Sequence, residues 1–299
     1  SPSGGDPARR WGPPISEGNS ITYQAVNRDK RSVTVDFSDP SAREKLGVFI
    51  GEHADVCVQN MRPKAVDALG LGADALTARN PRLIYCNMGA YGPKGPLSHL
   101  PGYDPLIQAF SGICHVTGPA DGDPCRLGVP VIDIGTGMWA VIGIQAALMR
   151  RHETGQGGVV DVSLFDTAMG WMTLAMSTVM VTGKSPGRYG TRGPGAVMPN
   201  QGFAAADGLI LITAGTDAQF ARLSTVLGCP QWSDDPRYAS APERAKNGAA
   251  LAGLIAEVIR TRPRSEWISM LNVANVPNAP INTPAEALNH PHTVASGIL

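Results

Sequence analysis

Two kinds of hydrophobic periodicity run through the first sixty residues of the chain. Residues 32–37 (SVTVDF) alternate apolar and polar positions, which predicts a strand. Residues 38–53 (SDPSAREKLGVFIGEH) start with an N-cap candidate and continue with helical spacing, and residues 55–60 (DVCVQN) predict a second short strand. These three segments together predict a β-α-β unit.

Helical and strand-like segments continue to alternate after this unit. Residues 62–81 predict one or two short helices, and residues 82–92 (RLIYCNMGAYG) predict a third strand. Residues 135–153 (GTGMWAVIGIQAALMRRHE) are strongly apolar and basic in their last turn, which predicts a buried helix. Residues 158–166 (GVVDVSLFD) are again strand-like. We therefore expect an α/β fold with a Rossmann-like large domain on a mainly parallel sheet, and binding loops at the strands' carboxyl ends.

The pattern changes near residues 183–195, which are rich in Gly, Arg and Pro and predict a domain boundary. Residues 202–215 (GFAAADGLILITAG) predict a hairpin with Asp207 and Gly208 at its turn. Helical runs follow near residues 217–227 and 246–260, so the later segment is expected to form a small α+β domain. The first eighteen residues have no periodicity and predict a loop. The predicted large domain spans residues 1–182, and the predicted small domain spans residues 183–285.

Composition excludes several classes of protein. With 43% apolar and 17% charged residues, the 299-residue chain is long enough for a large core. Lys and Arg total 25 and Asp and Glu total 25, so no overall field attracts nucleic acid or an anionic membrane. The apolar stretches are interrupted by Gly, Asp or Arg, and we expect a soluble protein without a membrane span. The five cysteines form no C-x-x-C pair, which argues against disulfides and zinc and favours the cytoplasm.

Motif searches remove further alternatives. The chain has no phosphate loop or dinucleotide fingerprint in a strand-to-helix context. Its six histidines show no metal spacing, and none lies beside a G-x-S-x-G elbow, so a metal site and a serine hydrolase are not expected.

Asp133 is the first candidate for chemistry. It lies in VPVIDIGTGMWAV, between an apolar run and a small-residue turn at the start of the most apolar helix. A carboxylate at the positive end of a helix dipole, with free N–H groups within reach, stays ionised while partly buried and suits a nucleophile. The alternative is that Asp133 is only an N-cap or turn residue.

Three other clusters carry weaker signals. Tyr103 and Asp104 precede an apolar helix and either contact a substrate or simply start the helix. Basic residues in 27–31 and 60–64 bracket the first β-α-β unit; they suit the phosphates of a nucleotide-like ligand, or they are solvated turns. The glycine-rich segment around Arg192 is either a mobile flap or a linker.

Taken in order, the motifs resemble those of the class III CoA-transferase family over essentially the whole chain. The motifs are GDPARRWGPP, NRDKRSVTVDF, ADVCVQNMRPKAVDALGL, NPRLIYCNMGAYGPKGP, GYDPLIQAFSGICHVTG, GVPVIDIGTGMWAVIGIQAALMRRHETGQG, VVDVSLFD, GFAAADGLILITAGTDAQFARL, DDPRYASAPERAKN and VPNAPINTPAEAL. The resemblance implies an acyl-CoA:carboxylate CoA-transferase in which Asp133 attacks the thioester and forms an aspartyl anhydride. Coenzyme A is then a substrate, the other substrate is a carboxylic acid, and no metal takes part.

The resemblance also implies roles for other residues. Those expected to bind coenzyme A are Lys30, Arg31, Asn60, Met61 and Arg62. Those expected to position the substrate are Tyr103, Asp104, Gly193 and Gly195. Similar alpha-methylacyl-CoA racemases carry His where this chain has Tyr103, and a phenol with a pKa near 10 is a poor base at pH 7. We therefore favour a transferase and keep a racemase-like isomerase as an alternative.

The ends of the chain differ from the family pattern. The family's N-terminal strand and helix and its C-terminal segment are expected to be missing, and residues 286–299 are expected to start the return to the large domain. A truncated remnant that binds coenzyme A without turnover is thus a further alternative. The resemblance also implies a homodimer in which the two chains interlock.

Overall fold

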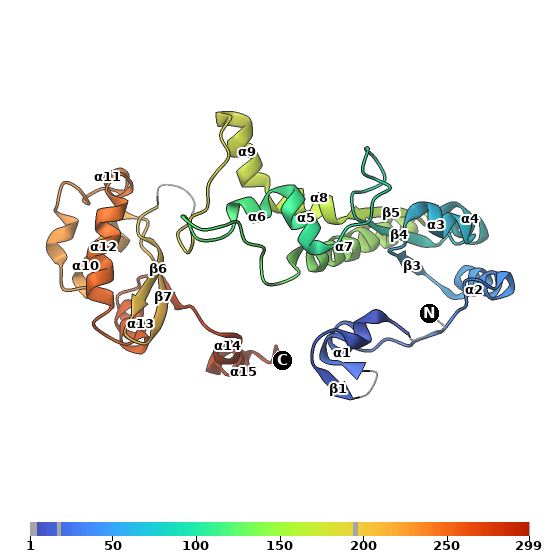
Figure 1. Cartoon of the computed structure of the whole chain (residues 1–299), viewed down its shortest axis with the longest axis horizontal. Helices are drawn as coiled ribbons and strands as arrows, with labels where there is room; N and C mark the ends of the chain where they lie inside the picture. Colours follow the sequence, from blue (N-terminus) through green and yellow to red (C-terminus); the bar gives the residue numbers. More distant parts are fainter. Residues whose placement is uncertain (1–4, 17–18, 194–196, 299) are drawn as a thin grey trace. The chain divides into compact units, whose positions relative to one another are not determined.

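The structure is a computed structural model that describes residues 5–16, 19–193 and 197–298. The chain divides into two compact units (Figure 1). Unit 1 consists of residues 1–115 and 125–186, and unit 2 consists of residues 116–124 and 187–299. The domain boundaries predicted from the sequence stay a prediction, and each unit is described by itself.

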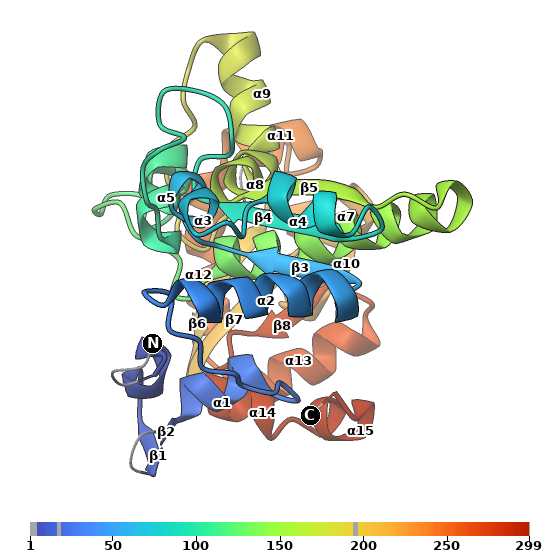
Figure 2. The same ribbon diagram turned by 90° about the vertical axis from the view of Figure 1, so that its right-hand side faces the viewer.

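A parallel three-stranded sheet forms the centre of unit 1. Its strands are β3 (Val56–Gln59), β4 (Ile84–Gly89) and β5 (Gly158–Ser163), in the order β3-β4-β5 (Figure 2). The predicted mixed α/β fold with a parallel sheet is therefore confirmed. Because all three strands run the same way, their carboxyl ends lie at one edge of the sheet.

Helices cover both faces of this sheet. On one face, Tyr85 packs with Leu71 and Leu76, and its hydroxyl donates a hydrogen bond of 2.8 Å to the carbonyl of Leu71. Burial raises the pKa of Tyr85 to about 12. On the other face, Val160 packs so closely on Gly143 that a side chain at residue 143 would clash with it. The helices near the first face are α2 (Pro40–His53), α3 (Pro63–Ala68) and α4 (Ala73–Arg79), and the second face is covered by α7 (Val131–Thr154).

The long helix α7 ends where the sequence predicts, because Gly155 takes the left-handed conformation (φ 74°) that terminates helices. It is buried along one side only. The buried residues are Ile132, Gly135, Thr136 and Ala140, whereas Met138, Ile142 and Met149 are more than half exposed. The prediction that this helix is buried is thus wrong for the side of α7 that carries Met138, Ile142 and Met149.

By length and composition alone, α7 is apolar enough to cross a membrane, with a mean hydropathy of 1.5 in its most apolar window. The sequence was expected to hold no such segment, and that expectation is wrong for residues 131–154. Core and interface helices of soluble proteins meet the same criterion, and 22% of this window is buried by the chain itself. Gly135 and Thr136, on the buried side of α7, pack against the helix α8 (Leu164–Trp171), so this side of α7 contacts protein.

Short helices complete unit 1. They are α5 (Asp104–Ser111), α6 (Ile113–Val116), α8 and α9 (Thr173–Thr182). Residues 164–166, predicted as the end of a strand, are instead the first turn of α8. Ser163 causes this change, since its hydroxyl accepts a hydrogen bond of 3.0 Å from the N–H of Asp166 and caps the helix.

The N-terminal part differs most from the prediction. Residues 32–37, predicted as a strand, have no strand conformation, and Val33 is 80% exposed. Alternating residues form a strand only when a neighbouring strand accepts their hydrogen bonds, and none in the described part of the chain does so. The first eighteen residues, predicted as a loop, contain a 3-10 helix, η1 (Pro7–Arg10), and a short strand, β1 (Pro14–Ser16). The short strand β2 (Asn19–Ser20) and the helix α1 (Ile21–Asn27) follow this segment.

Unit 2 is built on an antiparallel sheet of β6 (Asn200–Ala205), β7 (Gly208–Thr213) and β8 (Asn278–Pro280) (Figure 2). The predicted hairpin is confirmed, but its two-residue loop is Ala206 and Asp207, since Gly208 already pairs with Ala205 as the first residue of β7. Its core gathers around Phe203, Ile210 and Trp267. The other elements are α10 (Asp217–Val226), η2 (Pro230–Ser233), α11 (Ala241–Lys246), α12 (Gly248–Ile259), α13 (Arg264–Val273), α14 (Pro284–Leu288) and α15 (Pro291–Ser296).

Candidate active site

Asp133 lies in the first turn of α7, three residues after the helix N-cap, Pro130. Pro130 offers no side-chain hydrogen bond to the helix, so the first backbone N–H groups need acceptors from elsewhere. The interpretation of Asp133 as the N-cap is wrong, since that position belongs to residue 130. Its side chain is exposed, and no hydrogen bond to its carboxylate occurs within the described residues.

The acceptor for the first turn of α7 is the carboxylate of Asp104, at the start of α5. One oxygen, Oδ2, accepts hydrogen bonds from the N–H groups of Ile132 (2.8 Å) and Asp133 (3.2 Å). Asp104 is 5% exposed. A carboxylate from another helix thus occupies the place that an N-cap side chain usually takes.

This arrangement changes the electrostatics expected for Asp133. The sequence suggested free N–H groups that keep Asp133 ionised, but its own N–H and that of Ile132 are bound to Asp104. Exclusion of water by surrounding protein raises the pKa of the Asp133 carboxyl, and the nearby Asp104 raises the pKa further. Asp133 is therefore a more basic carboxylate than an ordinary aspartate.

Sequence reasoning missed Gln108 in this cluster. Its side-chain amide donates a hydrogen bond of 2.5 Å to Asp104 Oδ1 and accepts one of 2.8 Å from the N–H of Leu127. Gln108 is buried. The available signal was spacing, because residues 104 and 108 are four apart on one helix and so face the same side.

Tyr103 is the N-cap residue of α5, with 67% of its surface exposed. The alternative of a helix start is thus confirmed for this residue. Its neighbour in the chain is Asp104, so Tyr103 lies in the same segment as the carboxylate that binds α7. Whether it contacts a substrate stays a prediction.

The first predicted coenzyme-binding segment surrounds Lys30. The Lys30 ammonium donates hydrogen bonds to the carbonyl of Val26 (2.7 Å) and to the side chain of Asn27 (3.3 Å), which folds it against the end of α1. Arg31 is exposed. No hydrogen bond or ion pair among the described residues joins this segment to residues 60–62.

The second predicted segment follows β3. Asn60 and Arg62 are exposed, and the N–H of Met61 donates a hydrogen bond of 2.7 Å to the side chain of Gln59. Gln59 in turn donates to Asn87 (2.6 Å) on β4, and Asn87 donates to Asp161 (2.8 Å) on β5. This ladder anchors the loop to all three strands.

Two predicted residues lie in or near the glycine-rich segment of unit 2. Gly193 donates a backbone hydrogen bond of 3.0 Å to the carbonyl of Asn200. A Cβ atom at residue 193 would lie 2.2 Å from Nδ2 of Asn200, so a larger residue would require the Asn200 side chain to move. Gly195 lies outside the described residues.

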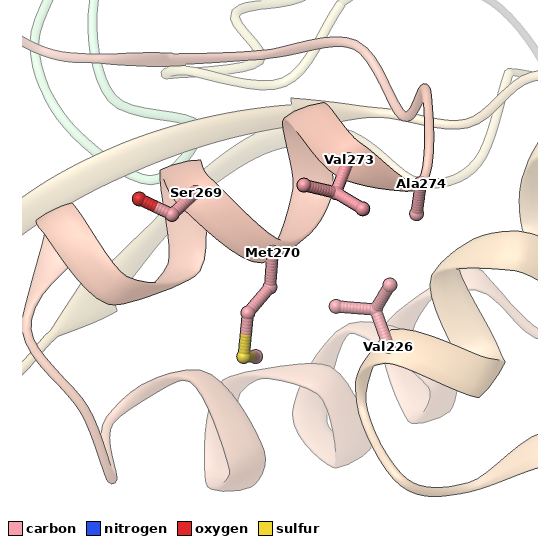
Figure 3. Close-up of a pocket in the computed structure, with 5 residues that line it drawn as sticks. All are labelled: Val226, Ser269, Met270, Val273 and Ala274. Atoms are coloured by element: carbon pink, nitrogen blue, oxygen red, sulfur yellow. The ribbon is translucent and has the colours of Figure 1, made fainter.

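A hollow of about 460 Å³ lies between α10 and α13 in unit 2 (Figure 3). Its lining consists of Val226, Ser269, Met270, Val273 and Ala274. None of these side chains carries a charge, so this hollow offers no partner for the phosphates of a coenzyme.

The described residues contain no group of three or more His, Cys, Asp or Glu side chains arranged to hold a metal ion. The polar cluster at the start of α7 holds two carboxylates and an amide. Such a set suits acid-base or nucleophilic chemistry.

Comparison with known proteins defines the class of this enzyme. The pattern of CoA-transferase family III matches residues 1–299, and the chain belongs to this family. It is an enzyme that transfers coenzyme A, and acyl-CoA is its substrate class.

Particular relatives support this assignment. The chain is 32% identical to succinyl-CoA:glutarate CoA-transferase of Mus musculus, over all of this chain and 68% of that protein. It is 36% identical to acetyl-CoA:oxalate CoA-transferase of Acetobacter aceti, over all of this chain and 76% of that protein. A crystal structure of a CAIB/BAIF family protein from Brucella suis superposes with a TM-score of 0.87 and 38% identity, covering 98% of this chain and 78% of that one.

Proposed function

We propose that this protein is an acyl-CoA:carboxylate CoA-transferase that uses Asp133 as its nucleophile. The observation that carries the proposal is the arrangement at the start of α7. Asp104 holds the backbone of the first turn, while the Asp133 carboxylate is left exposed. The CoA-transferase relatives described above support the reaction class.

The proposed reaction begins when a carboxylate oxygen of Asp133 attacks the thioester carbonyl. The carbon–sulfur bond breaks, the sulfur leaves as a thiolate, and the acyl group and Asp133 form a mixed anhydride. The thiolate then attacks the aspartyl carbonyl and expels the donor acid as a carboxylate, which leaves an aspartyl thioester. The acceptor carboxylate repeats these two steps in reverse order, so that the new thioester forms and Asp133 is regenerated.

The properties of Asp133 suit this role. A nucleophile must be ionised, reachable and basic enough to attack a carbonyl carbon. Asp133 is exposed, and both burial by protein and the charge of Asp104 raise its pKa above that of an ordinary aspartate. Perturbed pKa values of this kind cluster at functional sites.

The coenzyme is proposed to bind through Lys30, Arg31, Asn60, Met61 and Arg62. Diphosphate and ribose phosphate groups need several cationic donors. Arg31 and Arg62 are exposed and available as such donors, and the polar ladder behind Met61 keeps its loop rigid. Tyr103, Asp104, Gly193 and Gly195 are proposed to position the acyl group and the acceptor.

A chemical trap tests the nucleophile. The intact protein is mixed with acyl-CoA and hydroxylamine, and peptides are analysed by mass spectrometry. We expect a hydroxamate on Asp133 that requires acyl-CoA. Asp133→Asn should abolish both the label and the exchange of labelled coenzyme A between two acids. Asp74→Asn is the matched control, since Asp74 also lies in the first turn of a helix and is exposed.

Three outcomes would overturn this proposal. Exchange that persists in the Asp133→Asn variant rules out a covalent role for this residue. Deuterium incorporation at the alpha carbon without exchange would instead support the racemase-like alternative. Binding of coenzyme A by calorimetry without any turnover would support the remnant that only binds.

A homodimer of interlocked chains in the cytoplasm is part of the proposal. The exposed side of α7 supports the proposal of a dimer. Met138, Ile142 and Met149 lie in one stripe along the helix and are 57%, 52% and 73% exposed. An apolar stripe of this kind is normally covered by protein.

A further inference from the structure

We propose that Gln108 is a positioning residue for CoA transfer, which fixes the Asp104 carboxylate against the first turn of α7 and ties it to the segment that enters this helix. The inference rests on the proposed role of Asp133. It adds a residue whose side chain acts through two neighbours and touches no substrate.

The hydrogen bonds determine how the Gln108 amide is oriented. The N–H of Leu127 can only donate, so the atom that faces it at 2.8 Å is the amide oxygen. The amide nitrogen therefore faces Asp104 Oδ1, at 2.5 Å. Since this nitrogen can only donate, the oxygen of Asp104 that it meets must accept.

The same reasoning applies to the two carboxylate oxygens of Asp104. Its Oδ1 accepts from Gln108, and its Oδ2 accepts from the N–H groups of Ile132 and Asp133. All three of these partners are donors. They replace the hydrogen bonds to water that the buried Asp104 side chain loses on folding.

Gln108 also controls how the chain enters α7. Residues 127–130 lead into the helix, and the N-cap Pro130 makes no side-chain cap. Two side chains of α5 replace it: Gln108 binds the N–H of Leu127, and Asp104 binds the N–H groups of the first turn. Both restraints are lost or weakened when Gln108 is removed, and Asp133 lies in the turn that they hold.

The ionisable groups around this network are few within the described residues. Asp133 on α7 interacts with Asp104, and so does Cys114 on α6. Cys114 also interacts with Arg126 and Cys125 of the segment before α7. The neighbouring Tyr103 completes the set.

Exchanging the two side chains tests the proposal. In Asp104→Asn alone, an amide nitrogen would face the amide nitrogen of Gln108. In Gln108→Glu alone, two carboxylates would face each other. In the double variant, the amide oxygen at position 104 accepts the hydrogen bonds from the two helix N–H groups. The amide nitrogen at position 104 donates to the new carboxylate at position 108. The other oxygen of that carboxylate accepts from the N–H of Leu127. The net charge is unchanged, but the negative charge lies one hydrogen bond further from Asp133.

The measurements are kcat, the KM for acyl-CoA, the pH profile of kcat and the melting temperature. Each single variant should lose about 10- to 100-fold in kcat, with KM within about threefold, as for other supporting hydrogen bonds in active sites. The double variant should recover the melting temperature and most of kcat. The acidic limb of the kcat pH profile of the double variant should move to lower pH, because the negative charge at position 108 lies further from Asp133 than the charge at position 104 does. Gln156→Glu, at an exposed position, is the control for an added charge.

The outcomes separate this inference from the proposed function. Wild-type kcat and pH profile in Gln108→Glu would overturn it, and so would a folded double variant that recovers no activity. Recovery of the melting temperature and kcat with an unmoved acidic limb would contradict the influence of the Asp104 charge on the pKa of Asp133. Exchange of coenzyme A that persists in Asp133→Asn would contradict the proposed role of Asp133 as the nucleophile, independently of the results for the Gln108 variants.

Discussion

The carboxylate of Asp104 accepts a hydrogen bond of 3.2 Å from the backbone N–H of Asp133, so the residue that holds the helix also places a negative charge beside the proposed nucleophile. The two functions oppose each other energetically. Capping stabilises the start of α7, whereas the like charge makes ionisation of Asp133 harder. Active sites commonly retain such a conflict because the chemistry requires it.

Asp133→Asn should therefore raise stability at neutral pH. The folded-state pKa of Asp133 is raised above 3.8, so the folded protein holds this proton more tightly than the unfolded chain. Wild-type stability then falls, relative to the variant, as pH rises through the window above 3.8. Urea unfolding at pH 7 should show a small gain for Asp133→Asn, since the side chain is exposed, and at low pH the gain should vanish. A variant less stable than wild type at pH 7 would contradict this account.

Gly193→Ala should distort the glycine-rich segment. The added methyl group would lie 2.2 Å from Nδ2 of Asn200, whose Oδ1 accepts a hydrogen bond of 2.9 Å from Thr213. We expect a loss of about 1–2 kcal/mol in unfolding free energy and a higher KM for the substrates. Gly187→Ala is the control, because no atom lies within 4 Å of its added Cβ. Equal effects at both positions would show that close approach to Asn200 is unimportant.

The comparison of sequence and structure shows which signals are local. The end of α7 at Gly155 and the hairpin at Asp207 depend on a few adjacent residues, and both are predicted correctly. Residues 32–37 have a strand pattern, but a strand needs a neighbour, and sequence periodicity does not supply one.

The candidate site shows the same limit. The sequence identifies Asp133 and Asp104 as polar residues near helix starts, but not that one caps the helix of the other, since 29 positions separate them. Gln108 was overlooked because its role depends on Leu127, which comes near only after folding. Its buried amide was invisible to a search for charged residues.

The capping box of α14 should be sensitive to acid. The N–H of Thr283 donates a hydrogen bond to Glu286, and this bond, with Arg264, lowers the pKa of Glu286 to about 2. This carboxylate contributes to stability above its unfolded value of 4.5, and the contribution is lost as pH falls through 4.5 toward 2. In Arg264→Met, NMR titration should show a pKa for Glu286 that is higher than in the wild type but still lowered, because the Thr283 donors remain. An unperturbed pKa in the wild type would contradict the capping box.

Ile142→Glu should disrupt the proposed dimer. Ile142 lies midway along the exposed apolar stripe of α7, and a charge there would be buried without a partner in a dimer interface. Analytical ultracentrifugation should show a shift toward monomer. Since the proposed interlocked dimer would couple folding to association, the melting temperature should fall on dilution. Gln156→Glu, after the end of α7, should keep the wild-type mass. Co-sedimentation of the wild type with lipid vesicles, lost in Ile142→Glu, would instead indicate that the stripe binds a membrane.

Arg244 should be the most sensitive charged residue of unit 2. Its guanidinium is fully buried and donates hydrogen bonds to the carbonyls of Met198 (3.0 Å) and Tyr238 (2.9 Å) and to the carboxylate of Asp217 (2.8 Å). Arg244→Met leaves the two buried carbonyls without this donor, and we expect a loss of about 1–3 kcal/mol in unfolding free energy for each of them. Arg260→Met is the control, since Arg260 is exposed and pairs only with Glu257 in the described structure; its loss should be below about 0.5 kcal/mol. Chemical unfolding of both variants measures the difference, and similar losses would show that the buried hydrogen bonds add nothing beyond a surface ion pair.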